Sequence, residues 1–274
     1  MIDPGAVLAW GVPRLRDLPW RHERDPWRIL VAEVMLQQTR AERVVAKWSA
    51  FLERFPTPAD CASATLGDVL RLWQGLGYPR RARNLHATAT ECVERHGGEL
   101  PDDLDELLAL PGIGPYTARA VLAFAFERDV AVVDTNIARI LARTAGERLT
   151  PRRAQAAADA LVPADHGWVW NQTIMDLGAV LCRPRPHCGE CPLRTTCAWN
   201  VAGRPEPDPA IGSAGVSTTQ APFEGSDRQR RGRVMSALAS GDCDASDFDD
   251  VIVAGLVADG LVETTSDGRI RLPG

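Results

Sequence analysis

LPGIGPYTA (Leu110–Ala118) is the most informative stretch of this 274-residue sequence. Gly112 and Gly114 permit a tight turn, and a helix is expected to begin directly after Pro115. A glycine hairpin that opens onto a helix N-terminus points backbone N–H groups outward, where they can bind a phosphate without any basic side chain. The alternative is an ordinary corner between two helices. The stretch therefore predicts a helical fold with a candidate phosphate-binding hairpin.

Helical periodicity continues on both sides of this hairpin. Asp25 and Pro26 combine a capping carboxylate with proline at a first helical position, and they predict one helix over WRILVAEVMLQQTRAERVVAKW, residues 27–48. Further helices are expected over residues 80–96, after Tyr116, from about Asp134 and over residues 170–182. Few alternating strand patterns precede residue 200. We therefore expect an all-α body with short connections.

Composition divides the chain into three parts. Residues 1–201 are expected to form one large domain. Residues 202–225 are rich in Pro, Gly, Ser and Thr, which is typical of a linker. Residues 226–274 contain two short helical patterns followed by a hairpin pattern with an Asp-Gly turn, so we expect a small winged-helix-like module there.

Charge and hydropathy narrow the classes of function. The net charge is -5, but residues 1–201 hold 24 basic and 24 acidic side chains, so the acidic excess lies in residues 202–274. Such a balance neither supports nor excludes a nucleic-acid partner. No apolar run approaches the roughly 18 residues that a membrane span needs, and the N-terminus lacks the basic start of a signal peptide. We expect a soluble cytoplasmic protein.

Glu33 is a candidate general acid. It stands inside the apolar run ILVAEVML, where burial of a charge is unfavourable. A buried carboxyl group should have a raised pKa and hold a proton near neutral pH. The alternative is that Glu33 points to solvent from an amphipathic helix.

Asp134 is a candidate partner for Glu33. In VVDTNIARIL it follows an apolar run and precedes a helix, so helix N–H groups and the helix dipole should keep it ionised. An ordinary N-cap is the alternative for this residue alone. One protonated and one ionised carboxyl group together divide acid and stabiliser roles as glycoside cleavage requires.

Four cysteines, Cys182, Cys188, Cys191 and Cys197, form the pattern C-x5-C-x2-C-x5-C. Such crowding favours a metal site over disulfides in a chain without a secretion signal. Structural zinc sites usually pair two C-x-x-C knuckles, and only one is present. Four thiolates on a compact loop suit a 4Fe–4S cluster, the favoured interpretation, with zinc as the alternative. Arg183 and Arg185 in the first gap are candidate phosphate contacts.

Taken in order, these motifs resemble the helix-hairpin-helix superfamily of DNA glycosylases that includes endonuclease III and MutY. The resemblance covers roughly residues 8–200 and rests on LPWR (18–21), AEVMLQQT (32–39), GLGYPRRARNLH (75–86), LPGIGPYTA, VVDTNIARIL and the cysteine loop. AEVMLQQT and GLGY look like the adenine-excising MutY branch. The resemblance implies a six-helix lobe over about residues 23–128, with the hairpin at 110–118. It also implies a cluster lobe made of the N-terminal helix and residues 129–201.

The resemblance also implies roles for individual residues. Glu33 protonates the adenine ring, Asp134 stabilises the resulting sugar cation, and Gln38 and Tyr78 match positions that wedge into the duplex. Tyr116 stands where the endonuclease III branch has a Schiff-base lysine, which implies a glycosylase without strong lyase activity. The positions that match the base pocket or its support are Trp20, Arg21, Leu36, Tyr116, Asn136 and Gln172.

This sequence departs from the family pattern in three places. The first cysteine gap has five residues where the family usually has six, and Asp134-Thr135-Asn136 replaces Asp-Gly-Asn. Residues 226–274 are too short for the Nudix-related domain that reads 8-oxoguanine, so the opposite-base preference stays open. We expect a monomer that acts on mismatched double-stranded DNA at the nucleoid. The alternatives are a thymine or uracil mismatch glycosylase and a noncatalytic, cluster-containing DNA-binding protein.

Overall fold

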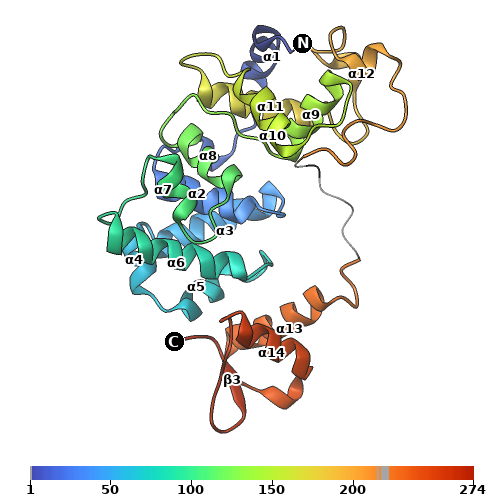
Figure 1. The fold of residues 1–274 in the computed structure, drawn as a ribbon. Coiled ribbons are helices and arrows are strands. Elements are labelled where there is room, and N and C mark those ends of the chain that lie inside the picture. The colour runs from blue at the N-terminus through green and yellow to red at the C-terminus, as the bar shows by residue number, and fades with distance from the viewer. Residues whose placement is uncertain (1, 215, 217–221) are drawn as a thin grey trace. The chain divides into compact units, whose positions relative to one another are not determined.

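The computed structural model describes residues 2–214, 216 and 222–274. These residues are mostly helical, and the all-α body expected from the sequence is confirmed. The chain divides into two compact units, one of Met1–Arg24 with Pro115–Thr219 and the other of Asp25–Gly114 with Gln220–Gly274 (Figure 1). None of the helices in the described part is both long enough and apolar enough to span a bilayer.

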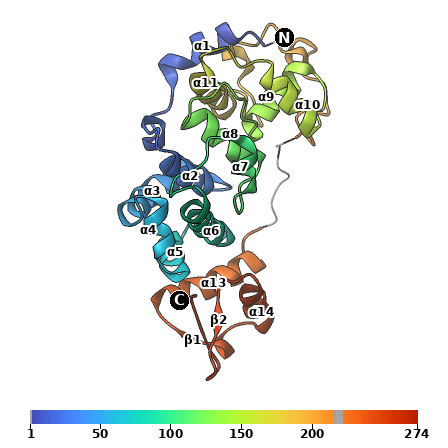
Figure 2. The ribbon, with the colours of Figure 1, turned by 60° about the vertical axis from the view of Figure 1, so that its left-hand side comes forward.

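In the first unit, the N-terminal helix packs against a helix from much later in the chain. α1 (Pro4–Gly11) lies beside α11 (Gly167–Val180), as Figures 1 and 2 show. A Cβ at Gly11 would lie 2.1 Å from Thr173 Cγ2, so the close approach depends on glycine. The unit also contains η1 (Val12–Arg14), η2 (Pro19–His22), α8 (Pro115–Phe124), α9 (Thr135–Ala145), α10 (Pro151–Asp159), η3 (Cys188–Glu190) and α12 (Ala198–Val201).

Helix α8 belongs to the first unit, so the boundary between the units differs from the expected one. The resemblance implies a six-helix lobe that ends near residue 128, whereas the units divide between Gly114 and Pro115. The reason is that α8 packs against α11 and buries most of its residues. The division therefore falls within the sequence of the hairpin, 110–118.

The second unit contains the helices that surround Glu33. They are α2 (Pro26–Leu36), α3 (Ala41–Arg54), α4 (Pro58–Ser63), α5 (Leu66–Trp73), α6 (Arg80–Arg95) and α7 (Leu104–Ala109). Its core includes an aromatic cluster in which the Phe51 ring meets Phe55 and Trp73 edge-on, with centroids 5.1 and 6.2 Å apart. Edge-on aromatic pairs add to the stabilisation from burial alone.

The prediction of one helix over residues 27–48 is wrong. The Asp25 side chain caps α2 as expected, accepting a hydrogen bond from Arg28 N at 2.9 Å. However, α2 ends at Leu36 and α3 begins at Ala41, because Gln38 takes a left-handed conformation with φ of 57°. The apolar period continues across this break because α2 and α3 pack against each other.

The C-terminal module has the expected two helices and hairpin. These are α13 (Asp227–Ser240), α14 (Asp250–Ala258) and the strands β2 (Glu263–Thr264) and β3 (Arg269–Arg271). A third strand, β1 (Cys243–Asp244), was not expected; it pairs antiparallel with β3 and gives the order β1-β3-β2. The 3-10 turn η4 (Ala245–Asp247) follows β1.

The expected linker, residues 202–225, is partly wrong. Asp208, Ala210 and Ser213 are buried in the first unit. Ala214 N donates to Leu149 O at 2.9 Å, and Leu149 N donates to Ser213 Oγ at 3.1 Å. The proline-rich composition therefore correctly indicates a segment without regular secondary structure. Up to residue 214, however, this segment packs against the first unit and is not a free linker. Residues 215 and 217–221 of the expected linker lie outside the described residues.

Candidate functional site

Glu33 is buried in α2, so the solvent-facing alternative is wrong. The residue is only 4% exposed and lies among the buried apolar side chains of its own helix. The cap at Asp25 and proline at the first position fix where this helix begins. The fold therefore holds one carboxyl group in an apolar setting, as the sequence analysis expected of a general acid.

Asp134 is the N-cap of α9. Its Oδ1 accepts a hydrogen bond from Ile137 N at 2.7 Å, and its Oδ2 accepts one from Asn136 Nδ2 at 2.8 Å. Burial of the carboxyl group raises the pKa of Asp134 above its ordinary value, although these hydrogen bonds and the charge of Arg139 act in the opposite direction. The cap was correctly predicted, but its effect on ionisation is outweighed by desolvation.

A buried ion network supports the segment around Trp20 and Arg21, both 6% exposed. The Arg21 guanidinium donates to both carboxylate oxygens of Asp176 at 2.7 and 2.8 Å, and Arg16 adds a second ion pair at 2.7 Å. Burial opposes ionisation of Asp176, but the hydrogen bonds from Arg21 and Arg16 lower its pKa below the ordinary value. Asp176 was missed in the sequence because its partners lie far away along the chain.

Arg81 organises the two loops that carry Gln38 and Tyr78. Its guanidinium donates at 2.6–3.0 Å to the carbonyl oxygens of residues 34, 35, 37, 76 and 77. Burial lowers the pKa of Arg81 to about 10, so the side chain remains charged near neutral pH. Gln38 and Tyr78 both have positive φ, 57° and 50°, a conformation that non-glycine residues rarely adopt.

We expect Arg81→Met to lower the free energy of unfolding by about 3 kcal/mol, because five carbonyl groups, most of them partly buried, lose a charged donor. Denaturant unfolding measures this, and Arg95→Met on the same helix is the control. Arg95 pairs with Glu91 at the surface, so its loss should cost less than about 1 kcal/mol. Equal stability of the two variants would show that Arg81 does not hold the loops.

The glycine hairpin is braced by α6. Gly112 has φ of 75°, and a Cβ there would lie 2.5 Å from Asn84 Nδ2, so only glycine fits. The Thr88 hydroxyl donates to Pro111 O at 2.8 Å. Gly114 has no positive φ, and a Cβ there would meet no described atom within 4 Å. The turn therefore requires Gly112, whereas at Gly114 glycine leaves the backbone open on the outside.

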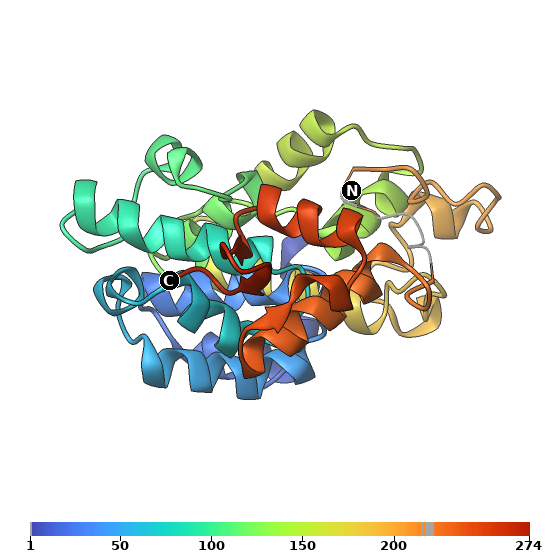
Figure 3. The same cartoon turned by 90° about the horizontal axis from the view of Figure 1, so that it is seen from below.

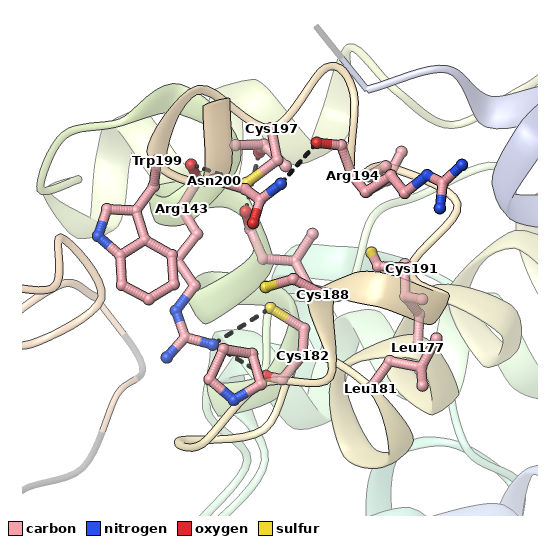
Figure 4. A pocket seen from close by; sticks show the side chains of 14 residues that line it. Arg143, Leu177, Leu181, Cys182, Cys188, Cys191, Arg194, Cys197, Trp199 and Asn200 are labelled. Atoms are coloured by element: carbon pink, nitrogen blue, oxygen red, sulfur yellow. Dashed lines mark hydrogen bonds between the residues drawn. The ribbon is translucent and has the colours of Figure 1, made fainter. Parts of the chain in front are cut away.

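The four clustered cysteines line one cavity of the first unit, together with Arg143, Leu177, Leu181 and Trp199 (Figure 4). Arg143 Nη1 donates to Cys182 Sγ at 3.4 Å, and its guanidinium lies 4.7 Å from the centroid of the Trp199 ring. Asp208, from the segment expected to be a linker, pairs with the lining residue Arg143 at 2.5 Å. Within the described ranges, no three His, Cys, Asp or Glu side chains gather closely enough to bind a single metal ion.

The remaining predicted residues are distributed over both units. Leu36 ends α2 and is half-buried, and Gln172 is buried in α11. Arg183 and Arg185 are exposed, and Arg183 Nη2 lies 2.6 Å from His187 Nε2. The second unit holds Glu33, Leu36, Gln38, Tyr78, Gly112 and Gly114, and the first unit holds Trp20, Arg21, Tyr116, Asp134, Asn136, Gln172, Arg183, Arg185 and the four cysteines.

Comparison with known proteins identifies the family. Residues 31–164 match the model of the HhH-GPD superfamily of base excision DNA repair proteins. The chain is 42% identical to an adenine DNA glycosylase of Mycobacterium tuberculosis, over 98% of this chain and 92% of the relative. It is 40% identical to that of Mycolicibacterium smegmatis, over 100% of this chain and 97% of the relative.

A solved structure of a thermostable thymine-DNA glycosylase is also similar, with a TM-score of 0.70 and 30% identity over 73% of this chain and 95% of the other. This likeness agrees with the two-unit helical architecture. The mycobacterial matches extend over nearly the whole of both relatives, C-terminal module included. The chain therefore belongs to the adenine DNA glycosylase family of the HhH-GPD base excision DNA repair superfamily.

Proposed function

We propose that this protein is a monofunctional glycosylase that hydrolyses the N-glycosidic bond of adenine mispaired with 8-oxoguanine or guanine in double-stranded DNA. The observation that carries the proposal is the burial of Glu33 within an adenine DNA glycosylase fold. Departure of a purine gains from protonation of the ring, and a carboxyl group in an apolar setting is suited to hold that proton.

In the proposed reaction the two carboxyl groups have different roles. Glu33 donates a proton to the adenine ring while the bond from the base to C1′ breaks and its electron pair leaves with the base. Asp134, as a carboxylate, stabilises the positive charge that develops on the sugar. Water then adds its hydroxyl to C1′ and releases a proton. In a duplex, this chemistry requires that the target base is flipped out of the stack.

Tyr116 supports a reaction without strand cleavage. It lies in the first turn of α8, directly after the hairpin, and its phenol cannot form a Schiff base with the sugar. The open backbone at Gly114 and the exposed side chains of Arg183 and Arg185 are proposed contacts to the DNA backbone. Because one chain carries both carboxyl groups, we propose that a monomer acts on the DNA of the nucleoid.

The four cysteines are proposed to hold a 4Fe–4S cluster. Their side chains border a common cavity of the first unit, where Arg143 Nη1 also donates to Cys182 Sγ at 3.4 Å. Four thiolate ligands are the usual donor set of such a cluster. When bound, it would crosslink the loop that carries Arg183 and Arg185.

Loss of one of these cysteines tests the cofactor. We expect the purified protein to contain about four iron and four labile sulfide ions per chain, and Cys191→Ser to lose most of both and to be less stable to heat. Cys243→Ser, in the C-terminal module, should keep them. One zinc ion per chain and no iron would instead support the alternative metal.

Base specificity is tested with duplexes that contain 8-oxoguanine:A, G:A, G:T or G:U. Strand breakage at adenine only after alkali treatment would support a monofunctional adenine glycosylase. The similarity to a thymine-DNA glycosylase structure makes excision of thymine or uracil opposite guanine the second candidate. Cleavage of the G:T or G:U duplex alone would favour that candidate, and binding without any cleavage would favour a noncatalytic protein.

A further inference from the structure

An arginine-rich cleft lies within the second unit, between the C-terminal module and the loops that carry Gln38 and Tyr78. It has a volume of about 1060 Å³ and is lined on one side by α13 and on the other by residues of the loops and the start of α3. Figure 3 shows the module (orange to red) beside the blue and teal helices of the same unit. Its basic lining residues are Arg40, Arg43, Arg228, Arg231 and Arg233.

Specific contacts hold the module against the helices of this unit. Asp259, after α14, pairs with Arg80 at 2.5 Å and also with Arg231, and its carbonyl oxygen accepts from Arg83. Gln74 Nε2 donates to Met235 O at 2.8 Å. These contacts place α13 against the loops, so its arginines line the same cleft as Gln38 and Tyr78.

A second contact lies near the C-terminus. Gly67 N donates to Pro273 O at 2.8 Å, and a Cβ at Gly67 would lie 2.7 Å from that oxygen. Arg228 Nη1 reaches the Tyr78 hydroxyl at 3.2 Å. The module thus touches both the outer surface of the helices and one of the proposed wedge residues.

The cleft has an excess of positive charge. Glu42 is its one acidic lining residue among the described residues, against five arginines. Arg231 is partly compensated by Asp259, but no described carboxylate pairs with Arg40, Arg43 or Arg233, and all three are exposed. Unpaired arginines that converge from two directions form a site suited to anionic oxygens.

We propose that this cleft binds phosphate groups of duplex DNA next to the mismatch, and that the C-terminal module thereby adds affinity that does not depend on the lesion. This inference rests on the proposed function, because Gln38 and Tyr78, which line the same cleft, are the residues proposed to enter the duplex. Phosphate contacts fix the position of a protein on DNA without reading bases. Residues 202–274 carry a net negative charge, so the basic lining of the cleft is not apparent from the charge of this segment.

The test is the salt dependence of binding to a fluorescent undamaged duplex. Each phosphate contact contributes about 0.9 to the slope of log affinity against log salt concentration. We expect Arg43→Ala with Arg233→Ala to reduce this slope by about 1.8 and to weaken binding of undamaged and 8-oxoguanine:A duplexes equally. The lesion duplex is measured in the Glu33→Gln background, so that no turnover occurs.

Arg230→Ala is the matched control on α13. Arg230 does not line the cleft and pairs with Asp227 and Asp249. It should leave the slope unchanged, and all variants should unfold at the wild-type temperature. An unchanged slope in the double variant, or a loss confined to the lesion duplex, would overturn the proposal. Because binding is measured without chemistry, absence of glycosylase activity would refute the proposed function but leave this result interpretable.

Discussion

Glu33→Gln is expected to reduce the single-turnover rate of adenine release by ~10²–10⁴-fold, the usual contribution of a general acid. Glutamine has nearly the same shape, so the helix should keep its packing, but the amide cannot donate a proton to a leaving base. Affinity for the mismatched duplex should remain within a few-fold of wild type. Quench experiments with excess enzyme, combined with fluorescence anisotropy, separate these two quantities.

Glu53→Gln provides the control for this substitution. Glu53 lies exposed near the end of α3, so the same chemical change there should not alter the rate. A Glu33→Gln enzyme that retains wild-type turnover would show that the buried carboxyl group is not the acid. A parallel loss of binding and rate would point instead to a structural role.

Asp134→Asn is expected to decrease turnover by ~10²–10³-fold, because an electrostatic stabiliser of the transition state is removed. Asparagine remains a good N-cap, so α9 should stay intact. In the wild type the rate should rise with pH through the raised pKa of Asp134, since the ionised form is required. A single-turnover pH profile whose acid limb lies above the ordinary pKa of an aspartate side chain would agree with this.

The same substitution should increase stability at neutral pH. A carboxyl group with a raised pKa in the folded state binds its proton more tightly there than in the unfolded chain. Its ionisation therefore lowers the free energy of unfolding as pH rises from the unfolded pKa through the folded one. Asparagine does not ionise, so the variant should have a higher Tm than the wild type at pH 8 and the same Tm near pH 4. Each kcal/mol of added stability should raise Tm by about 2–4 °C. A gain independent of pH would contradict this account.

The parts of the site that the sequence predicts depend on local chemistry. Asp25 and Asp134 are recognisable caps because capping involves residues only three positions apart. Gly112 is recognisable because a left-handed turn favours glycine. The sequence allowed two interpretations of Glu33, buried or facing solvent. Only the packing of other helices against α2 shows that it is buried.

The parts that were wrong or missed depend on distant residues. The break at Gln38 is held open by Arg81, which lies on another helix. Nothing in the sequence distinguishes Arg81 from its arginine neighbours. The pairing of Arg143 with Asp208 joins a helix to a segment whose composition suggests a linker. Such long-range partners cannot be identified from the spacing of residues within either segment.

The packing of α1 against α11 has a consequence for biosynthesis. Helix α1 cannot make its packing contact with α11 until residues 167–180 have been translated, because the partner helix comes much later in the chain. At about 5–20 residues per second, this delay amounts to roughly 8–30 seconds. During that time Asp25–Gly114 can already collapse, so α1 reaches its contact with α11 only after the residues between the two helices have been made.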